Sequence, residues 1–204
     1  MIPQIVENKI VFNKERNALD NFVISFTEIL DSLKIDYVIV SGYVAIIFGR
    51  SRATEDIDVL IEPISKEKFS KLYSTLIARN YWIINATTEK DAFEILEDKL
   101  SIRIADNKKV IPNLEVKFVK DEIDRYSLDK KIRVEIGDKT LFISPLEMQI
   151  AYKLYLSGEK DIEDAYFLFS LFKNSLNKEE LKTIIKTLKV EDPAKKYLRE
   201  LYGN

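Results

Sequence analysis

Two residue types are missing from this chain, and their absence excludes several kinds of catalytic site. The sequence has 204 residues and contains no cysteine and no histidine. It therefore cannot form a disulfide, a cysteine nucleophile, an iron–sulfur cluster, or a zinc site built from cysteine or histidine. A Ser-His-Asp triad and an imidazole base are excluded as well. Catalysis would have to use carboxylates, lysine, arginine, tyrosine, hydroxyls, backbone amides, or a hard cation such as Mg²⁺, Mn²⁺ or Ca²⁺ held by oxygen.

Long apolar runs and a strong excess of one charge are also missing. No apolar run approaches the roughly 20 residues that a membrane span needs. The first ten residues, MIPQIVENKI, lack the apolar segment of a signal peptide. The net charge is −2 and the pI about 5.5, so the chain as a whole has no basic footprint for nucleic acid. We therefore expect a cytoplasmic protein that does not bind membranes.

The first 143 residues alternate between helical and extended patterns. Apolar residues at helical spacing predict helices over 14–34, 43–49, 65–79 and 88–98. Apolar or alternating segments predict strands over 37–41, 56–61, 81–84, 100–105 and 114–119. KIRVEI and KTLFIS predict a hairpin that turns at Gly137-Asp138. These elements predict an α/β domain over residues 1–143, with a mixed β-sheet flanked by helices.

From Ser144 onward the pattern is helical. Ser144 as N-cap, Pro145 at the first helical position and Glu147 predict a helix start. Helices are predicted over 145–157, 160–173, 178–188 and 193–202, the last two starting at Asn177 and at Asp192-Pro193. We predict a C-terminal helical bundle over residues 144–204.

The stretch SRATEDIDVLIE places two acids close together on one predicted strand. Asp56 and Asp58 are two residues apart, so their side chains point to the same face. Two like charges side by side are unfavourable unless water or a cation neutralises them. Such a pair suits Mg²⁺ or Mn²⁺ that bridges to phosphate oxygens. Gly42, just before a helix, predicts backbone N–H groups and a positive helix end that could receive the phosphates.

Three further residues could complete this site. Arg52 and Thr54, in the polar link before the acidic strand, could contact the same anion, although Arg52 could instead pair with Glu55. Glu115 is the best candidate for a third carboxylate, because it projects from a strand with apolar neighbours on both sides. The alternative is that Glu115 and Lys117 form the solvated face of an edge strand. We interpret Lys117 and Arg103 as ordinary surface charges.

A second group of charges lies on the predicted C-terminal helices. A helical wheel places Asp161 near the centre of an apolar stripe and Asp164 beside Leu171. Acids rarely face a core unless they are paired or functional, and Lys153 on the preceding helix is a candidate partner. Two interpretations stay open: a Lys–Asp pair that fixes the helices, or a set that binds a base, a ribose or the acceptor. Six nearby aromatic residues are predicted to be packing residues, with a base-stacking platform as the alternative: Tyr152, Tyr155, Tyr166, Phe167, Phe169 and Phe172.

Several of these motifs resemble one known superfamily. VIVSGYVAIIFGRSRATEDIDVLIE is similar to the signature of the DNA-polymerase-β-like nucleotidyltransferases, most closely the small prokaryotic AbiEii-like toxins. Their Arg-x-Thr-x-Asp-Ile-Asp run matches Arg52, Thr54, Asp56 and Asp58. LEVKF resembles the strand that carries their third acid, and SPLEMQIAYKLYLSGEKDIEDA their helical Lys…Lys-Asp-x-x-Asp segment. The resemblance covers roughly residues 36–168.

The resemblance implies a metal-dependent enzyme that moves NMP from an NTP such as ATP to a hydroxyl acceptor, with tRNA as one candidate. It implies a cognate antitoxin protein as a candidate partner. It assigns Asp56, Asp58 and Glu115 to catalysis and to binding two Mg²⁺ (or Mn²⁺). It assigns nucleotide binding to a second set: Ser41, Gly42, Arg52, Thr54, Lys153, Asp161 and Asp164.

A rival hypothesis remains open: the fold has lost catalysis and serves as a module that binds nucleotide or a protein partner. Tyr43 favours this module hypothesis, because the superfamily has a small residue at that position of Ser41-Gly42-Tyr43. The presence of all three acids favours the enzyme.

Overall fold

The computed structural model describes residues 5–6 and 9–203. Residues 1–4 and 7–8, which belong to the MIPQIVENKI segment and to the predicted domain 1–143, lie outside the described residues. Residue 204, the last of the predicted helical region, does so too. Within the described chain, no helix has the length and apolar character needed to span a membrane.

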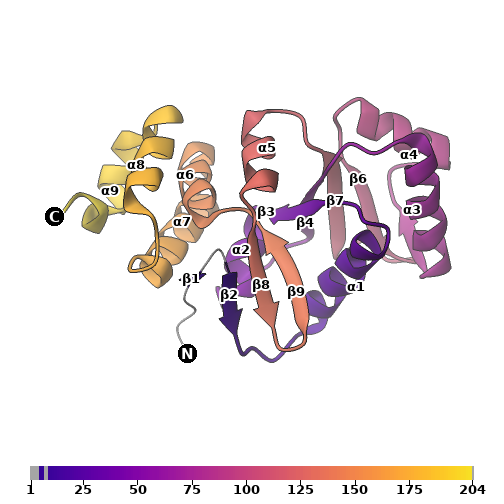
Figure 1. Ribbon diagram of the computed structural model, residues 1–204, viewed down its shortest axis with the longest axis horizontal. Helices are drawn as coiled ribbons and strands as arrows, with labels where there is room; N and C mark the ends of the chain where they lie inside the picture. The colour runs from indigo at the N-terminus through magenta and orange to yellow at the C-terminus, as the bar shows by residue number, and fades with distance from the viewer. Residues whose placement is uncertain (1–4, 7–8, 204) are drawn as a thin grey trace.

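A mixed β-sheet runs through the centre of the molecule (Figure 1). Within the described residues it has nine strands in the order β1-β2-β8-β9-β3-β4-β7-β6-β5. Their bounds are β1 (Ile5–Val6), β2 (Lys9–Phe12), β3 (Tyr37–Val40), β4 (Asp56–Ile61), β5 (Tyr81–Ile83), β6 (Ile102–Asp106), β7 (Asn113–Phe118), β8 (Ile132–Ile136) and β9 (Lys139–Ile143). β4 pairs antiparallel with β3 and parallel with β7. The predicted α/β fold with a mixed sheet is confirmed.

Helices cover the sheet and form the C-terminal part of the chain. Their bounds are α1 (Ala18–Ser32), α2 (Gly42–Ile47), α3 (Lys66–Ala78), α4 (Glu89–Glu97), α5 (Glu122–Asp129), α6 (Leu146–Leu156), α7 (Glu159–Phe172), α8 (Lys178–Thr187) and α9 (Glu191–Tyr197), followed by a 3₁₀ turn, Arg199–Tyr202. The helices from α6 onward, orange to yellow in Figure 1, stand together at one end of the molecule. The predicted C-terminal helices are therefore confirmed.

Some elements were missed or misplaced by the sequence patterns. β1, β2 and α5 were not predicted, and α5 is a mostly polar helix whose N-cap is Asp121. The N-cap of α6 is Pro145, not Ser144, because the Ser144 amide donates to the Ile39 carbonyl of β3 and continues the sheet. α9 begins at Glu191, so the predicted start at Asp192-Pro193 is wrong. The Asn177 cap of α8 is confirmed.

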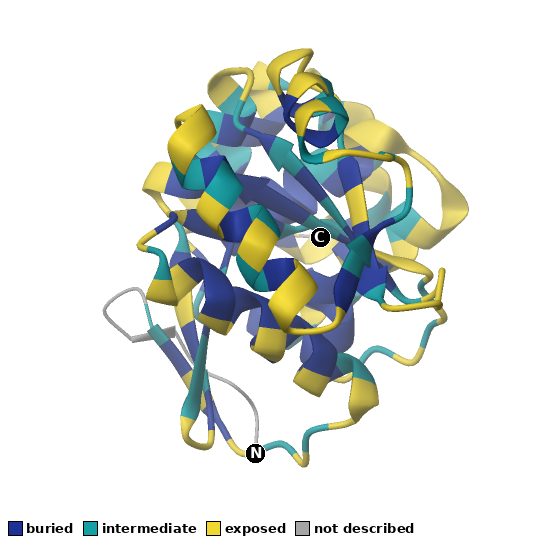
Figure 2. Cartoon of the chain, turned by 90° about the vertical axis from the view of Figure 1, so that its right-hand side faces the viewer, coloured by how far each residue is buried: buried dark blue, intermediate teal, exposed yellow. Residues whose placement is uncertain are grey.

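The two faces of the sheet are covered very differently. On one face, Ile57, Val59 and Ile61 belong to the large hydrophobic core shared with α1, α3 and α4. On the other face, Leu60 forms only a small cluster, in which α5 contributes Leu128. Figure 2 shows the buried residues lining the inner side of the molecule and the exposed ones its outer surfaces. Because α5 covers only part of the second face, polar side chains of β4 and β7 can reach solvent there.

The C-terminal helices share the large core with the sheet. Phe48, which ends α2, packs edge-on against Phe172 of α7, with ring centroids 4.8 Å apart. The same hydrophobic cluster contains residues from both sides of the predicted boundary at 143/144. The division into two domains stays a prediction.

Tyr43 lies in this core and not at the open face of the sheet. Its side chain is fully buried, and its hydroxyl donates to Asp20 of α1 over 2.9 Å. Lys14 forms an ion pair with the same carboxylate, which is also fully buried. Tyr43 therefore does not occlude the surface beside Gly42, and its hydroxyl is directed to Asp20 rather than to that surface.

We predict that Tyr43→Phe lowers the free energy of unfolding by about 1–3 kcal/mol, the usual cost of removing a hydrogen bond to a buried charged group. Urea denaturation at 25 °C measures the change. Tyr73→Phe is the matched control, since Tyr73 of α3 is half-buried against the core and forms no hydrogen bond with a described residue. Equal stabilities of Tyr43→Phe and wild type would show that the Asp20 contact contributes nothing.

Candidate functional site

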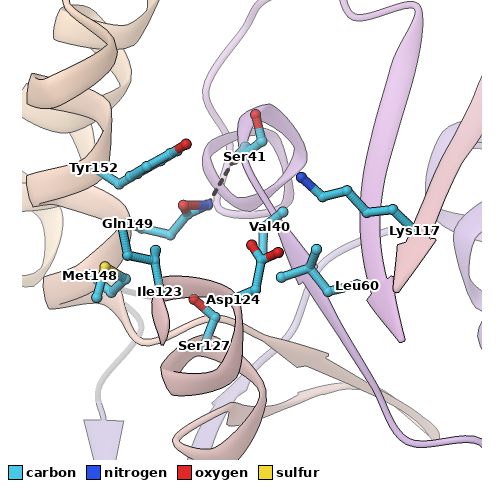
Figure 3. Close-up of a pocket in the computed structure, with 10 residues that line it drawn as sticks. All are labelled: Val40, Ser41, Leu60, Lys117, Ile123, Asp124, Ser127, Met148, Gln149 and Tyr152. Atoms are coloured by element: carbon cyan, nitrogen blue, oxygen red, sulfur yellow. Dashed lines mark hydrogen bonds between the residues drawn. The ribbon is translucent and has the colours of Figure 1, made fainter. Parts of the chain in front are cut away.

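A sharp turn joins β3 to α2 and begins the candidate site. Ser41 adopts φ 64° and ψ −139°, a backbone conformation that non-glycine residues rarely occupy. The amide side chain of Gln149, on α6, donates to the Ser41 carbonyl over 3.0 Å (Figure 3). Strained residues of this kind persist where surrounding contacts hold them, and they concentrate at functional sites. We call Ser41 and Gly42 the elbow.

The three predicted acids lie next to the elbow on the open face of the sheet. Asp58 pairs with Val40 on one side and with Glu115 on the other. Burial raises the pKa of Asp58, a hydrogen bond from the Ser41 side chain lowers it, and the charges of Asp56 and Glu115 raise it further. The pKa remains above its ordinary value. The structure thus brings Asp56, Asp58 and Glu115 together, as predicted.

Glu115 differs from the two aspartates because it already has a cationic partner. Arg103, its cross-strand neighbour on β6, forms an ion pair with it over 2.6 Å. β7 lies between β4 and β6, so the edge-strand interpretation of Glu115 and Lys117 is wrong. Arg103 is likewise more than an ordinary surface charge.

The donor chemistry of this face fits a hard divalent cation. Carboxylate oxygens are the ligands that Mg²⁺ and Mn²⁺ prefer, and, in addition to the larger effect of burial, the like charges of Asp56 and Glu115 lie close enough to Asp58 to raise its pKa. In the described part of the chain, no three acidic side chains are already arranged to hold a metal ion. Asp56 and Asp58 could bind one cation as they stand, whereas Glu115 would first have to leave Arg103.

A buried ionic cluster lies on the α7 side of the elbow. The Asp164 carboxylate is fully buried and pairs with Arg50 at 2.6 Å, Arg52 at 2.5 Å and Lys153 at 3.1 Å. Asp161 pairs with Lys153 at 2.6 Å. The Lys–Asp pairing is confirmed, but the proposed pair between Arg52 and Glu55 is wrong. The helical wheel also misjudged depth, because the Asp161 side chain is 25% exposed and that of Asp164 is 0% exposed.

The cluster positions Arg52 against the elbow. A Cβ atom added to Gly42 would lie 3.0 Å from a guanidinium nitrogen of Arg52, so only glycine leaves full room for this contact. The Thr54 hydroxyl donates to the Asp56 carbonyl over 2.8 Å. Arg52 and Thr54 therefore flank the elbow and the acids, while Lys153, Asp161 and Asp164 lie behind Arg52. A direct role of the last three in ligand binding stays a prediction.

A small pocket opens beside the elbow, between the sheet, α5 and α6 (Figure 3). Its volume of about 50 Å³ would hold roughly four water molecules. The strands contribute Val40, Leu60 and Lys117, the elbow Ser41, α5 contributes Ile123, Asp124 and Ser127, and α6 contributes Met148, Gln149 and Tyr152.

Lys117 is the cation of this pocket. In Figure 3 its ammonium group extends from β7 toward Ser41. It forms no ion pair or hydrogen bond with any described residue, yet its charge lowers the pKa of both Asp58 and Asp124. Burial is the larger influence on Asp124, whose pKa stays above its ordinary value. Sequence reasoning missed Lys117, although its two-residue spacing from Glu115 placed it on the same face.

Other pocket residues gave little signal in the sequence. Asp124 lies on α5, a helix that was not predicted. Tyr152 packs against the core in part, as predicted, and it also lines the pocket and stacks on Tyr155, with ring centroids 5.8 Å apart. Tyr155 and Tyr166 are each 56% exposed, so their assignment to packing is wrong. Phe169 and Phe172 are buried as predicted, and Phe167 packs against the core in part.

Comparison with known proteins finds similarity in structure but not in sequence. No model of a protein family matches the chain, and no curated protein has a matching sequence. Among solved structures, an antigenic nucleotidyltransferase-like protein from Paracoccidioides brasiliensis is similar, with a TM-score of 0.55 and 20% identity over 85% of this chain and 88% of that one.

Two antibiotic-modifying proteins are also similar in structure. ANT(2″)-Ia in complex with adenylyl-2″-tobramycin has a TM-score of 0.54 and 13% identity, over 85% of this chain and 98% of that one. The lincosamide antibiotic adenylyltransferase LnuA, with lincomycin bound, has a TM-score of 0.50 and 14% identity, over 76% of this chain and 99% of that one. The chain therefore has the fold of nucleotidyltransferase-like proteins.

We predict that Asp164→Ala destabilises the protein by about 3–5 kcal/mol, because three basic side chains then lose the buried carboxylate with which they pair. Asp161→Ala should cost only about 1 kcal/mol, since Lys153 keeps Asp164 and the site is partly exposed. Urea denaturation of both variants gives the comparison. A larger loss for Asp161→Ala would contradict the assignment of Asp164 as the centre of the cluster.

Proposed function

We propose that this protein is a metal-dependent nucleotidyltransferase that moves NMP from an NTP to a hydroxyl acceptor. One observation supports the proposal above all: Asp58 lies in register with Glu115, directly beside the strained Ser41-Gly42 elbow. In this chain the arrangement is carried by a fold that is similar to that of nucleotidyltransferase-like proteins.

Each residue of the site has a role in this proposal. Asp56 and Asp58 would hold Mg²⁺ or Mn²⁺, with Glu115 as the third ligand. When bound, the cation would supply positive charge to phosphate oxygens and to the attacking oxygen. Arg52, held at Gly42 by Asp164, and Lys117, directed toward Ser41, would bind phosphate oxygens from two sides.

The reaction itself is a substitution at the α-phosphorus of the NTP. The acceptor oxygen bonds to that phosphorus, and the bond from the phosphorus to the oxygen of the β-phosphate breaks. Pyrophosphate leaves, and the hydroxyl proton passes to water or to a carboxylate. The chain needs no histidine for these steps, in keeping with its composition.

Two acceptor classes follow from the two kinds of similarity. The resemblance of short motifs to those of AbiEii-like toxins favours a hydroxyl of tRNA, and with it an antitoxin protein as partner. The similar structures contain adenylyl-tobramycin and lincomycin, which favours a hydroxyl of a small molecule. Incubation with labelled NTPs, Mg²⁺ or Mn²⁺, and either total tRNA or a panel of small hydroxyl compounds separates these classes by where the label goes.

One observation in the structure supports the module hypothesis. Glu115, the third acid, is neutralised by Arg103, and a site with only two free carboxylates could bind a nucleotide without transferring it. The enzyme and the module differ in whether Glu115 contributes to turnover.

We predict that Mn²⁺ or Mg²⁺ plus an NTP raises the melting temperature of the wild type, because a ligand of the folded state stabilises it. Asp56→Asn/Asp58→Asn should abolish the shift. Asp98→Asn/Asp192→Asn, which removes two exposed acids elsewhere, should keep it. A full shift in the Asp56/Asp58 variant would show that the ligand binds at another site.

We predict that Glu115→Gln keeps binding of the metal–nucleotide complex but slows transfer by at least about a hundredfold, the scale of losing a few kcal/mol of transition-state stabilisation. Labelled-product formation measures transfer, and calorimetry measures binding. Equal rates for wild type and variant would exclude Glu115 as the third ligand. Binding without transfer in the wild type, across both acceptor classes, would support the module.

A further inference from the structure

The open face of the sheet carries a row of three charged residues across three neighbouring strands. Arg103 on β6 lies in register with Glu115 on β7, which lies in register with Asp58 on β4. Side chains at paired positions of neighbouring strands point to the same face. The guanidinium of Arg103 therefore lies on the far side of Glu115 from Asp58.

The position of Arg103 in this row is fixed by its backbone. Its amide donates to the Asn85 side chain over 2.8 Å, and its carbonyl accepts from the Ile84 amide over 2.7 Å. The register of β6 against β7 extends over four residue pairs. Because strand register cannot shift by small steps, Arg103 and Glu115 stay neighbours whatever binds at the site.

Glu115 alone among the three proposed metal ligands is neutralised by a basic side chain. Within the described chain, Asp56 and Asp58 have no Lys or Arg nitrogen within ion-pair distance, whereas Arg103 contacts Glu115 at 2.6 Å. The Glu115 side chain is only 19% exposed, while that of Arg103 is 53% exposed. A cation at Asp56 and Asp58 meets uncompensated negative charge, but a cation at Glu115 must first displace a guanidinium.

We infer that Arg103 competes with a metal ion for Glu115, so that the protein without nucleotide binds one cation and admits a second only when Glu115 leaves Arg103. This inference rests on the proposed function, since it assumes that Asp56, Asp58 and Glu115 are metal ligands. Arg103 is then a positioning residue: it acts through Glu115. The positive charge of a second cation must draw Glu115 away from Arg103, or phosphate oxygens must draw the Arg103 guanidinium away from Glu115.

Metal binding to the full chain without nucleotide tests the inference directly. Mn²⁺ is titrated into the protein, with calorimetry for affinity and stoichiometry, and paramagnetic resonance for the free ion. We expect one Mn²⁺ per wild-type chain. Arg103→Gln should bind a second Mn²⁺, or bind Mn²⁺ at least about tenfold more tightly, because a positive charge next to a ligand has been removed.

Three further variants make the result specific to Glu115. Arg79→Gln removes an exposed arginine at the end of α3 and changes the net charge equally, so it should behave as the wild type. Arg103→Lys keeps the charge and should also remain close to the wild type. Arg103→Gln/Glu115→Gln should lose the gain in Mn²⁺ binding. Because the Arg103 side chain is 53% exposed, these variants should fold normally.

The failure of this inference can be told apart from the failure of the proposed function. Equal Mn²⁺ binding by wild type and Arg103→Gln, with binding still lost in Asp56→Asn/Asp58→Asn, would overturn the inference alone. A gain in Mn²⁺ binding by Arg103→Gln that persists in Arg103→Gln/Glu115→Gln would also overturn the inference. No Mn²⁺ binding by wild type or Arg103→Gln would overturn both the inference and the metal dependence of the proposed function.

Discussion

The pairing of β4 with its two neighbours is the constraint on which the candidate site depends. β3 runs antiparallel to β4 and ends at Val40, opposite Asp58, so the turn that follows must lie beside the acids. β7 runs parallel to β4 and sets Glu115 next to Asp58. A slip of one residue in either ladder would turn the acids into the hydrophobic core. The apolar residues of β4, which fill that core, therefore fix the position of the acids.

A second interaction connects this sheet to the C-terminal helices. Asp164 is buried and gathers Arg50, Arg52 and Lys153 around one carboxylate. Such a cluster adds little net stability compared with apolar packing, but removing one partner is costly, so it specifies one arrangement of the helices and the loop. The same contacts hold Arg52 against Gly42. The sequence left two alternatives for Lys153, Asp161 and Asp164, either to pair and fix the helices or to serve a ligand. One cluster can do both, because it fixes the helices and also positions Arg52.

The charges on the open face are only partly balanced, and this distribution bears on both hypotheses of function. Arg103 neutralises Glu115, while Lys117 lies close enough to Asp58 to lower its pKa. Asp56 keeps an exposed and unneutralised carboxylate. An enzyme would need ligands that redistribute these contacts, whereas a binding module could leave them as they are. Because the similar structures have low sequence identity to this chain, they show its fold alone. The contacts of these charged residues are therefore what distinguishes an enzyme from a binding module.

The sequence by itself determined the α/β class, most of the strands and helices, and the face of the sheet on which the three acids lie, because these depend on local periodicity. Alternation put Asp56 and Asp58 on one face, and a polar residue between apolar ones identified Glu115. Tertiary structure alone decided the partners of the charges. Arg52 pairs with a residue 112 positions away, and Arg103 reaches Glu115 only through the register of two strands. Such contacts depend on how distant elements pack. The pocket depends on packing as well, because α5, which no pattern predicted, contributes to its lining only through its position over the sheet.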